Sequence, residues 1–488
     1  MAISFGTSGW RALIADEFTF ANVRRVAAAV ARFLVETGDA AKGVLVSYDT
    51  RFLADSFAWC AADEFLRHGV GVRLTDRDAP TPAIAHAVVT GGLGGAVNLT
   101  ASHNPPRYCG LKFSPATGAA APTEVTDRIE EILKMEIEVR GEGPVEREDL
   151  LENPGCALVS VKEPYLARLE EIVDTQALEA NPLKIVVDCL YGTCRGYLPE
   201  FLLDHGCEVK VLHAYRDAFF GGHTPEPSGP SLEELSQAVR DSDAVVGLAC
   251  DGDADRFGVV DSFGHYVNSN MVLALVFWHL ARHRGWEGGV ARSVATTHLV
   301  DALAKKLGRK VFQTPVGIKH LAEWVQKGEA LLGGEESSGI CFRDHVLDKD
   351  GILACAIVAE ALARSGRSVR QLIEDLYVEA GRRYLDGRLN LRLTEELAPL
   401  VRERLAADDL DCLPVTSGSK GIHLYADMDG SRDTDEVRDY AKGIAEELEA
   451  ELIQARNQIE IRDNWFRMHM GVFTDIRQAI RDRISWIE

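Results

Sequence analysis

Residues 94–113, GGAVNLTASHNPPRYCGLKF, join an apolar run directly to a polar loop. The run that ends at Leu99 is apolar enough for a buried strand, and the consecutive prolines Pro105 and Pro106 exclude both a helix and a central strand after it. Ser102 stands between the two. In open α/β sheets, ligands and chemistry collect at the rim where strands end. The stretch therefore predicts an α/β sheet with Ser102 on a stiff loop at its rim, and a capped turn without a function explains the same residues.

Helices and strands alternate on both sides of this stretch. Residues 21–36 carry apolar side chains at helical spacing, and residues 43–51 form a β-branched run that ends in polar residues. The alternation restarts near residue 182 and again near residue 289. Three α/β units of about 100 residues or more therefore precede a tail of different composition.

Changes in composition set the domain boundaries. Residues 138–156 are acidic and contain Gly and Pro, and residues 261–270 form a second polar break. After residue 380, short strands and a long charged helix predict an α+β domain. The expected fold is of the α/β class, with three successive mixed-sheet domains and a smaller α+β C-terminal domain. The expected bounds are 1–150, 151–262, 263–380 and 381–488.

The overall charge limits the partners. The 488 residues include 53 Lys+Arg against 75 Asp+Glu, a net charge of -22. Nucleic acid and anionic membranes require a basic face, so we expect neither as a partner, whereas a few cations can hold a small phosphate. The most apolar stretch, residues 271–281, is about half the length of a membrane span. Ten cysteines without a C-x-x-C pair, and no leader-like N-terminus, predict reduced thiols and a cytoplasmic location.

Three carboxylates follow another apolar strand, in the sequence CDGDADRFG. Asp251, Asp253 and Asp255 stand at alternate positions, where their repulsion would be relieved by a divalent cation, Mg²⁺ above all. An EF-hand loop also contains alternating aspartates, but it requires an acidic residue at its twelfth position. Ser262 stands at that position here, so the sequence does not fit an EF-hand. A plain acidic surface turn remains an alternative, and Arg256 is either its ion-pair partner or a cation that orients the acids or a phosphate.

A third polar loop, GGEESSG at residues 333–339, follows a further apolar strand. Short carboxylate and hydroxyl side chains on such a loop suit hydrogen bonding to neighbouring sugar hydroxyls, although Glu/Ser/Gly turns are common for structural reasons. Together with Ser102, the carboxylates and two available cations, Arg11 and Lys112, this loop favours phosphoryl transfer between a serine and a sugar.

The motifs resemble those of the α-D-phosphohexomutase family, over roughly residues 1–380. They are, in chain order, FGTSGWRA (5–12), YDTRF (48–52), TASHNPP (100–106), FFGGHTPEPS (219–228), DGDADRFG (251–258), TTHL (296–299), TPVGIK (314–319), GEESSG (334–339) and DKDGILA (348–354).

The resemblance implies a four-domain enzyme around a central cleft that interconverts hexose 1-phosphate and hexose 6-phosphate through a hexose 1,6-bisphosphate. It implies catalytic roles for Ser102 as phosphoserine, His103, Lys112 and Arg11, although a role for His103 in orienting its neighbours explains its position equally well. It also implies one Mg²⁺ held by the three aspartates and the phosphate on Ser102. It also implies sugar or phosphate recognition by Glu335, Ser337, Arg256, Thr297, His298 and Lys319. Glucose 1,6-bisphosphate is the expected activator, and the expected assembly is a monomer or homodimer.

The C-terminal region departs from the family pattern, in which a loop like R-x-S-G-T-E-P grips the non-reacting phosphate. One alignment makes residues 417–421 a degenerate loop, with Ser417, Ser419 and Lys420 as phosphate binders. The other, which fits the order of elements better, deletes the loop. The last 25 residues have no family counterpart and suggest either an amphipathic contact face or a cap on the fourth domain.

Two classes of function follow. The first is an active mutase for glucose phosphate, with mannose phosphate next. The second is a non-mutase descendant, either a sugar-phosphate binding or regulatory protein or a phosphatase-like enzyme, that kept the chemical loops and lost the phosphate grip.

Overall fold

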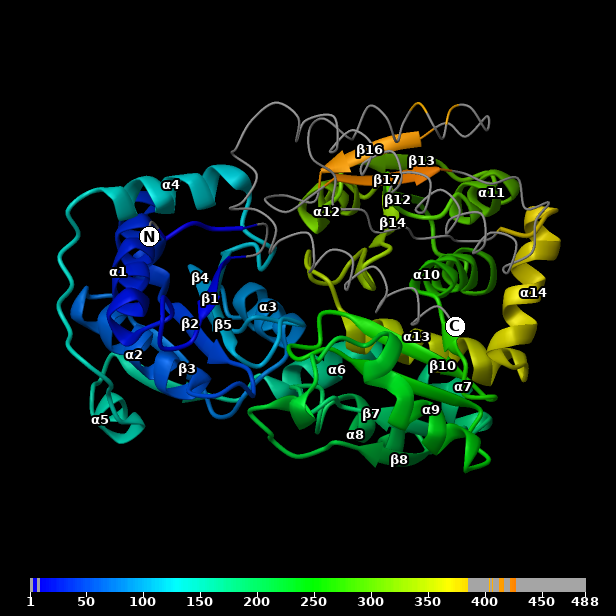
Figure 1. Cartoon of the computed structure of the whole chain (residues 1–488), viewed down its shortest axis with the longest axis horizontal. Helices are drawn as coiled ribbons and strands as arrows, with labels where there is room; N and C mark the ends of the chain where they lie inside the picture. Colours follow the sequence, from blue (N-terminus) through cyan, green and yellow to red (C-terminus); the bar gives the residue numbers. More distant parts are fainter. Residues whose placement is uncertain are drawn as a thin grey trace, which may run out of the picture. The chain divides into compact units, whose positions relative to one another are not determined.

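The computed structural model describes residues 3–6, 9–384, 403, 406, 412–416 and 422–426, the last two segments without their side-chain environment. The chain divides into two compact units, Met1–Ala380 and Gly381–Glu488. The first unit carries three sheets with their helices (Figure 1). No helix among the described residues is long and apolar enough to cross a membrane.

The first sheet has the strand order β1-β5-β4-β2-β3-β6. β5 runs antiparallel to both β1 and β4, and the other neighbours are parallel. Every residue of β2 and β4 is buried, because helices cover both faces of the sheet. The strands are Trp10–Leu13 (β1), Val44–Tyr48 (β2), Val72–Thr75 (β3), Gly95–Leu99 (β4), Tyr108–Pro115 (β5) and Cys156–Val159 (β6). The helices are Phe20–Thr37 (α1), Ala54–Arg67 (α2), Thr81–Thr90 (α3), Thr123–Lys134 (α4) and Arg147–Leu151 (α5).

The first long helix, α1, shows how local sequence sets these elements. Thr19 caps its start, because its side chain accepts a hydrogen bond from the Asn22 amide. Gly38 ends it in the left-handed conformation, with φ of 80°. The apolar face between these two residues is buried, and the helix packs against α2 and α4.

The second sheet has the order β11-β10-β9-β7-β8. β8, β7 and β9 are parallel, and β10 and β11 are antiparallel to their neighbours. Its strands are Lys184–Asp188 (β7), Glu208–Leu212 (β8), Val246–Cys250 (β9), Phe257–Asp261 (β10) and Tyr266–Val267 (β11). The helices of this region are Lys162–Ile172 (α6), Thr175–Ala180 (α7), Leu198–Asp204 (α8) and Glu233–Arg240 (α9).

The third sheet has the order β13-β12-β14-β15, in which only β15 is antiparallel to its neighbour. Its strands are Gly289–Ser293 (β12), Val311–Thr314 (β13), Ala330–Glu335 (β14) and Gly339–Phe342 (β15). The helices are Ser269–Trp278 (α10), Leu299–Lys306 (α11), Ile318–Gln326 (α12), Gly351–Ser365 (α13) and Val369–Ala380 (α14). Every residue of α10 is buried, as expected for a helix that is apolar all round.

The predicted class, mixed-sheet α/β domains, is confirmed. Two strands extend sheets beyond the boundaries expected from composition: β6 follows residue 150 yet pairs with β3, and β11 follows residue 262 yet pairs with β10. The polar stretch at residues 138–156 therefore leads into β6 of the first sheet, and the stretch at residues 261–270 contains β11 of the second sheet. The nine cysteines of the first unit are free and buried, as predicted.

In the C-terminal unit the structure describes an antiparallel pair, Cys412–Thr416 (β16) and Ile422–Ala426 (β17). The long charged helix expected in this unit lies outside the described residues.

Candidate active site

Ser102 lies on the loop between β4 and β5, at the carboxyl end of β4. Its backbone is in the left-handed region, with φ of 50°, and its side chain is almost completely buried. The Ser102 amide donates to Thr100 Oγ1 at 2.9 Å, and Ser102 Oγ donates to Asp251 Oδ2 at 2.6 Å. The loop therefore directs the hydroxyl of Ser102 at a carboxylate of the second sheet.

The carboxylate loop occupies the turn from β9 to β10. Asp251, Asp253 and Asp255 are all buried, and one oxygen from each lies within 4.8 Å of the others. The carboxylate loop lies directly against residues 100–107, the loop that carries Ser102 and is called the serine loop below. A Cβ on Gly252 would lie only 2.8 Å from the Ser102 carbonyl oxygen. The two loops thus form one site at the junction of two sheets.

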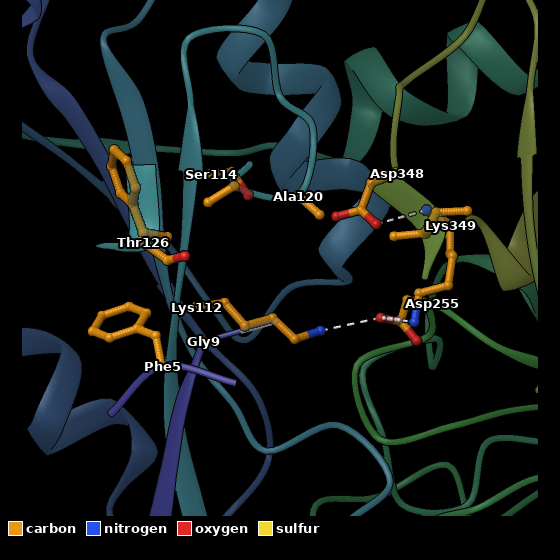
Figure 2. A pocket seen from close by; sticks show the side chains of 12 residues that line it. Phe5, Gly9, Lys112, Ser114, Ala120, Thr126, Asp255, Asp348 and Lys349 are labelled. Carbon is orange, nitrogen blue, oxygen red and sulfur yellow. Dashed lines mark hydrogen bonds and ion pairs between the residues drawn. The ribbon is translucent and has the colours of Figure 1, made fainter. Parts of the chain in front are cut away.

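Two lysines form ion pairs with Asp253 and Asp255. Lys112 Nζ, from β5, lies 2.5 Å from Asp253 Oδ2 and 3.1 Å from Asp255 Oδ2. Lys349 Nζ, from the third domain, lies 3.0 Å from Asp255 Oδ2. Figure 2 shows both ammonium groups close to the Asp255 carboxylate. Three domains therefore supply the charges of this cluster.

Burial and mutual repulsion set the protonation of the cluster. Burial raises the pKa of Asp251 well above its usual value, and the charges of Asp255 and Asp253 add to the effect. Burial also opposes the charge of Lys112, but Asp253 and Asp255 outweigh it and raise the pKa of this lysine. The cluster thus keeps a charged lysine next to its acids.

The carboxylate oxygens fit a hard cation. Asp253 Oδ1 and Asp255 Oδ1 are buried without a hydrogen-bond partner, which is costly unless something else contacts them. Oxygen donors from a few carboxylates are what Mg²⁺ prefers. The three aspartates could hold such an ion, with the oxygen of Ser102 beside them.

Arg11, His103 and Arg256 surround Ser102 and the cluster. Arg11 Nη1 donates to Asn104 Oδ1 at 2.7 Å, within the serine loop. His103 Nδ1 lies 3.4 Å from Ser102 Oγ, and burial, followed by the charges of Arg256 and Arg11, lowers the pKa of this histidine. Its imidazole is therefore neutral near pH 7. Arg256 Nε is buried without a hydrogen-bond partner and lies 3.9 Å from Asp255 Oδ1, so its guanidinium retains hydrogen-bonding capacity.

The expected sugar-binding residues gather at the carboxyl edge of the third sheet. Glu335 ends β14, and its Oε1 accepts from the Gly317 amide at 2.6 Å. Thr297 follows the neighbouring strand β12, and its amide donates to Asn270 Oδ1. Lys319 is the second residue of α12, which follows β13, and its ammonium contacts Thr123 of the first domain. The strands that precede these residues are neighbours in one sheet, because β12 pairs with both β13 and β14. The hydrogen bond from the Gly317 amide to Glu335 links the end of β14 to the start of α12.

Two further residues of this edge are partly solvent-accessible. Ser337 lies on the turn between β14 and β15. His298 precedes α11, and its Nδ1 lies 3.5 Å from Asp301 Oδ2. Ser417, Ser419 and Lys420, expected to bind phosphate, lie outside the described residues.

A pocket lies beside the cluster and is lined by residues of all three domains. Figure 2 shows Lys112 on the same side as Phe5 of the first domain, with its ammonium pointing across to Asp255, and Asp348 and Lys349 on the opposite side. Burial raises the pKa of Asp348 to about 6, against the lowering effect of Lys349 and Lys112.

Sequence reasoning missed two contacts of the cluster. Lys349 belongs to the motif DKDGILA, which contributes to the family resemblance, but the local sequence does not indicate its contact with Asp255. Thr81, the first residue of α3, donates from Oγ1 to Asp253 Oδ2 at 2.7 Å, and its amide donates to the Asp253 carbonyl. Nothing in the local sequence around Thr81 indicates this contact.

Family models match most of the chain. Models described as phosphoglucomutase/phosphomannomutase, alpha/beta/alpha domains I, II and III, match residues 2–140, 163–264 and 268–380, in that order. Residues 386–484 match a different model, described as LigD, primase-polymerase domain. The region in which we expected the phosphate grip is thus similar to part of another protein family.

Individual relatives cover the same residues. A phosphoglucomutase/phosphomannomutase of Thermococcus kodakarensis is 31% identical over 390 residues, which is 78% of this chain and 83% of the relative. A phosphoglucosamine mutase of Frankia alni is 32% identical over 391 residues, 75% of this chain and 80% of the relative. The structure of a Thermus thermophilus protein assigned as a phosphomannomutase aligns with a TM-score of 0.74 and 31% identity, covering 88% of this chain and 92% of that one.

A more distant structure shares the fold. Aspergillus fumigatus N-acetylphosphoglucosamine mutase, solved with GlcNAc-6P and magnesium, aligns with a TM-score of 0.55 at 14% identity, over 92% of this chain and 96% of that one.

Proposed function

This chain belongs to the α-D-phosphohexomutase family, and we propose that it interconverts hexose 1-phosphate and hexose 6-phosphate through a phosphoserine at Ser102. The enzyme is an intramolecular phosphotransferase of the phosphoglucomutase/phosphomannomutase type. The observation that carries the proposal is the 2.6 Å contact between Ser102 Oγ and Asp251 at a buried cluster of three carboxylates.

The first half-reaction transfers a phosphoryl group from Ser102 to the sugar. The P–O bond to Ser102 Oγ breaks, and the free hydroxyl oxygen of the hexose phosphate bonds to phosphorus, which yields a hexose 1,6-bisphosphate. The sugar then turns end over end, and its other phosphate returns to Ser102. Each transfer moves one proton from a hydroxyl and returns one to an oxygen that leaves phosphorus.

Lys112 and His103 suit the two protonation tasks. Lys112 is held protonated by Asp253 and Asp255, so it can donate a proton or a charged hydrogen bond. His103 is held neutral beside Ser102, so its imidazole can accept a hydrogen bond from a hydroxyl there, and the burial and arginine charges that lower its pKa oppose full protonation. Arg11 anchors the serine loop through Asn104 and places a positive charge next to the transferred group.

We propose that Asp251, Asp253 and Asp255, together with a phosphate oxygen on Ser102, hold one Mg²⁺. Their unpartnered oxygens and close spacing support this assignment. The ion would offset charge on the transferred phosphoryl group. A distant relative was solved with magnesium and a sugar phosphate, which agrees with a small-molecule substrate.

Recognition of the sugar is assigned to the edge of the third sheet. Glu335 and Ser337 would bind hydroxyls, with Thr297, His298, Lys319 and Arg256 at the sugar or its phosphate. Glucose is the proposed substrate and mannose the next candidate; the relatives bear glucose, mannose and glucosamine names. Glucose 1,6-bisphosphate would restore phosphate to Ser102 as an activator. The location is proposed as cytoplasmic and the assembly as a monomer or homodimer.

The C-terminal region supports a second candidate function, that of a protein that binds or hydrolyses sugar phosphates without isomerising them. Residues 386–484 resemble a primase-polymerase model, and the mutase grip on the non-reacting phosphate is expected in this region. A descendant that binds or hydrolyses sugar phosphates without isomerising them would retain the loops of the first unit. The acidic chain still argues against a nucleic-acid partner, and a gel-shift assay with single- and double-stranded DNA would test that expectation.

A coupled assay separates these candidates. The full-length protein is incubated with glucose 1-phosphate, Mg²⁺ and a trace of glucose 1,6-bisphosphate, and glucose 6-phosphate is measured beside released inorganic phosphate. Mannose 1-phosphate and glucosamine 1-phosphate are run in parallel. Formation of glucose 6-phosphate that is abolished by Ser102→Ala supports the mutase. Phosphate release without isomerisation supports the phosphatase-like alternative.

A further inference from the structure

Arg51 contacts the serine loop and belongs to the motif YDTRF (48–52), for which we predicted no role from the sequence. Its side chain is fully buried, and its guanidinium makes five hydrogen bonds, as many as it has N–H groups. Nε donates to Asp49 Oδ2 at 3.1 Å. The other four bonds go to backbone carbonyl oxygens: three in the loop, of Ser102 at 2.5 Å, Asn104 at 2.7 Å and Pro105 at 2.9 Å, and that of Tyr108, which begins β5, at 3.0 Å.

Asp49 completes the support from the other side of Ser102. Its Oδ2 accepts from Thr100 Oγ1 at 2.6 Å, and Thr100 Oγ1 in turn accepts from the Ser102 amide at 2.9 Å. Both backbone polar groups of Ser102 are therefore fixed by the same pair: the carbonyl by Arg51, and the amide through Thr100 and Asp49.

This support acts on a strained residue. Ser102 has φ of 50°, a conformation that residues other than glycine adopt only when their surroundings impose it. A serine that relaxed to the extended region would swing its Cβ and Oγ away from Asp251 Oδ2, now 2.6 Å away. The hydrogen bonds to its carbonyl and amide are the contacts that oppose this relaxation.

The second domain encloses the guanidinium. The ring centroid of Phe220 lies 5.0 Å from Arg51 Cζ, and Arg216 Nη2 donates to the Arg51 carbonyl at 3.1 Å. Phe220 is buried, so little water reaches the guanidinium from this side. The low polarity strengthens the charge-assisted bonds to the loop.

We propose that Arg51, held by Asp49, is the positioning residue that fixes Ser102 in its left-handed conformation and so directs Oγ at the phosphoryl-transfer site. The inference rests on the proposed function, because it assigns Arg51 a part in phosphorylation of Ser102. A lysine cannot replace the arginine: its three donors on a compact ammonium do not reach both the Asp49 carboxylate and the four carbonyl oxygens.

The test compares Arg51→Lys with Arg24→Lys. Arg24 is the matched control, because it is also buried in the first domain and bonds to carboxylates and backbone carbonyls, those of Asp63, Glu64 and Gly143. For each full-length variant we would measure kcat and KM for glucose 1-phosphate and, by intact mass, the fraction phosphorylated after incubation with glucose 1,6-bisphosphate. Mg²⁺ affinity by calorimetry reports whether the carboxylate loop is intact.

Arg51→Lys should lower kcat about 100-fold, since a misplacement on the order of 1 Å costs that much, while KM and Mg²⁺ affinity stay within about threefold. Its crystal structure should show Ser102 outside the left-handed region. Arg24→Lys should keep the wild-type kcat. If Arg51→Lys does not fold, Arg51→Gln, which keeps part of the hydrogen bonding without charge, is measured in the same way.

Wild-type kcat in a folded Arg51→Lys or Arg51→Gln protein, or Ser102 unmoved in the crystal, would overturn the inference. An equal loss of kcat in Arg24→Lys would also overturn it, because the effect would then be general to buried arginines. Failure of the proposed function itself looks different: the wild-type protein would acquire no phosphate on Ser102 and would not isomerise the sugar.

Discussion

Replacing Asp253 by asparagine keeps the shape of the side chain and removes one negative charge from the carboxylate cluster. In the structure, Oδ2 accepts from Lys112 Nζ at 2.5 Å and from Thr81 Oγ1 at 2.7 Å, whereas Oδ1 is buried without a partner. An asparagine at this position can accept the hydrogen bonds from Lys112 and Thr81 only with its side-chain carbonyl oxygen. Its NH₂ group then occupies the position of Oδ1, so the variant offers a donor where a cation requires an acceptor.

The expected loss follows from that exchange. One charge-assisted contact contributes about 1.5–3 kcal/mol, and each 1.36 kcal/mol is a factor of ten, so Mg²⁺ affinity should fall about 10- to 150-fold. Activity at limiting Mg²⁺ should fall by a similar factor and recover in part at high Mg²⁺. Because the carbonyl retains both hydrogen bonds, thermal unfolding in chelator should shift by only about a few degrees.

Calorimetric titration of Mg²⁺ into metal-stripped full-length protein measures this loss. Asp261→Asn is the matched control: Asp261 is a buried carboxylate on β10 that accepts from the Phe263 and His265 amides, outside the cluster. Unchanged Mg²⁺ affinity in Asp253→Asn would refute the assignment of the ion to the three aspartates. An equal loss in both variants would show that the second domain had been disturbed as a whole.

Three other perturbations test separate parts of the site. Ser102→Ala should carry no phosphate in peptide mass analysis and lose kcat by several orders of magnitude, since the transferred group has no acceptor; phosphate found only on another residue would sink the assignment. Thr81→Val should lower the free energy of unfolding by about 1.5–3 kcal/mol, because Asp253 loses a hydrogen bond and Asn98 Nδ2 loses its acceptor, with Thr81→Ser as the control that retains both. Denaturant titration measures this effect, and a Thr81→Val protein as stable as wild type would contradict it. Lys420→Ala should raise KM about tenfold if residues 417–421 are a degenerate phosphate loop and should leave KM unchanged if the loop is deleted.

Local sequence predicted the elements that depend on local patterns. The apolar run before Thr100 is the buried strand β4, and the alternation of helix and strand is confirmed in three mixed sheets. The three aspartates lie together because their spacing on one turn forces them to. The roles assigned to the site residues remain predictions.

The site residues that the sequence did not predict depend on contacts between segments that are far apart in the chain. Thr81 and Lys349 contact the cluster only because the folded chain brings α3 and the third domain against the turn between β9 and β10, and no local pattern encodes that approach. Arg51 was visible in the sequence, but its role depends on four carbonyl oxygens whose directions are set by the folded loop. The expected phosphate binders of the C-terminal unit lie outside the described residues, where similarity to a primase-polymerase model gives the sequence a second interpretation.

The division of the site among three sheets sets an order of events during synthesis on the ribosome. A nascent chain that has emerged as far as Asp255 already contains Ser102 and all three carboxylates, but it lacks Lys349, which contacts Asp255, and the Glu335 loop. Under the proposed function, the growing chain would therefore carry the serine and the carboxylates before it carries the residues proposed to bind the sugar. Phosphoryl transfer to a sugar would then begin only after the third domain has folded onto the first two.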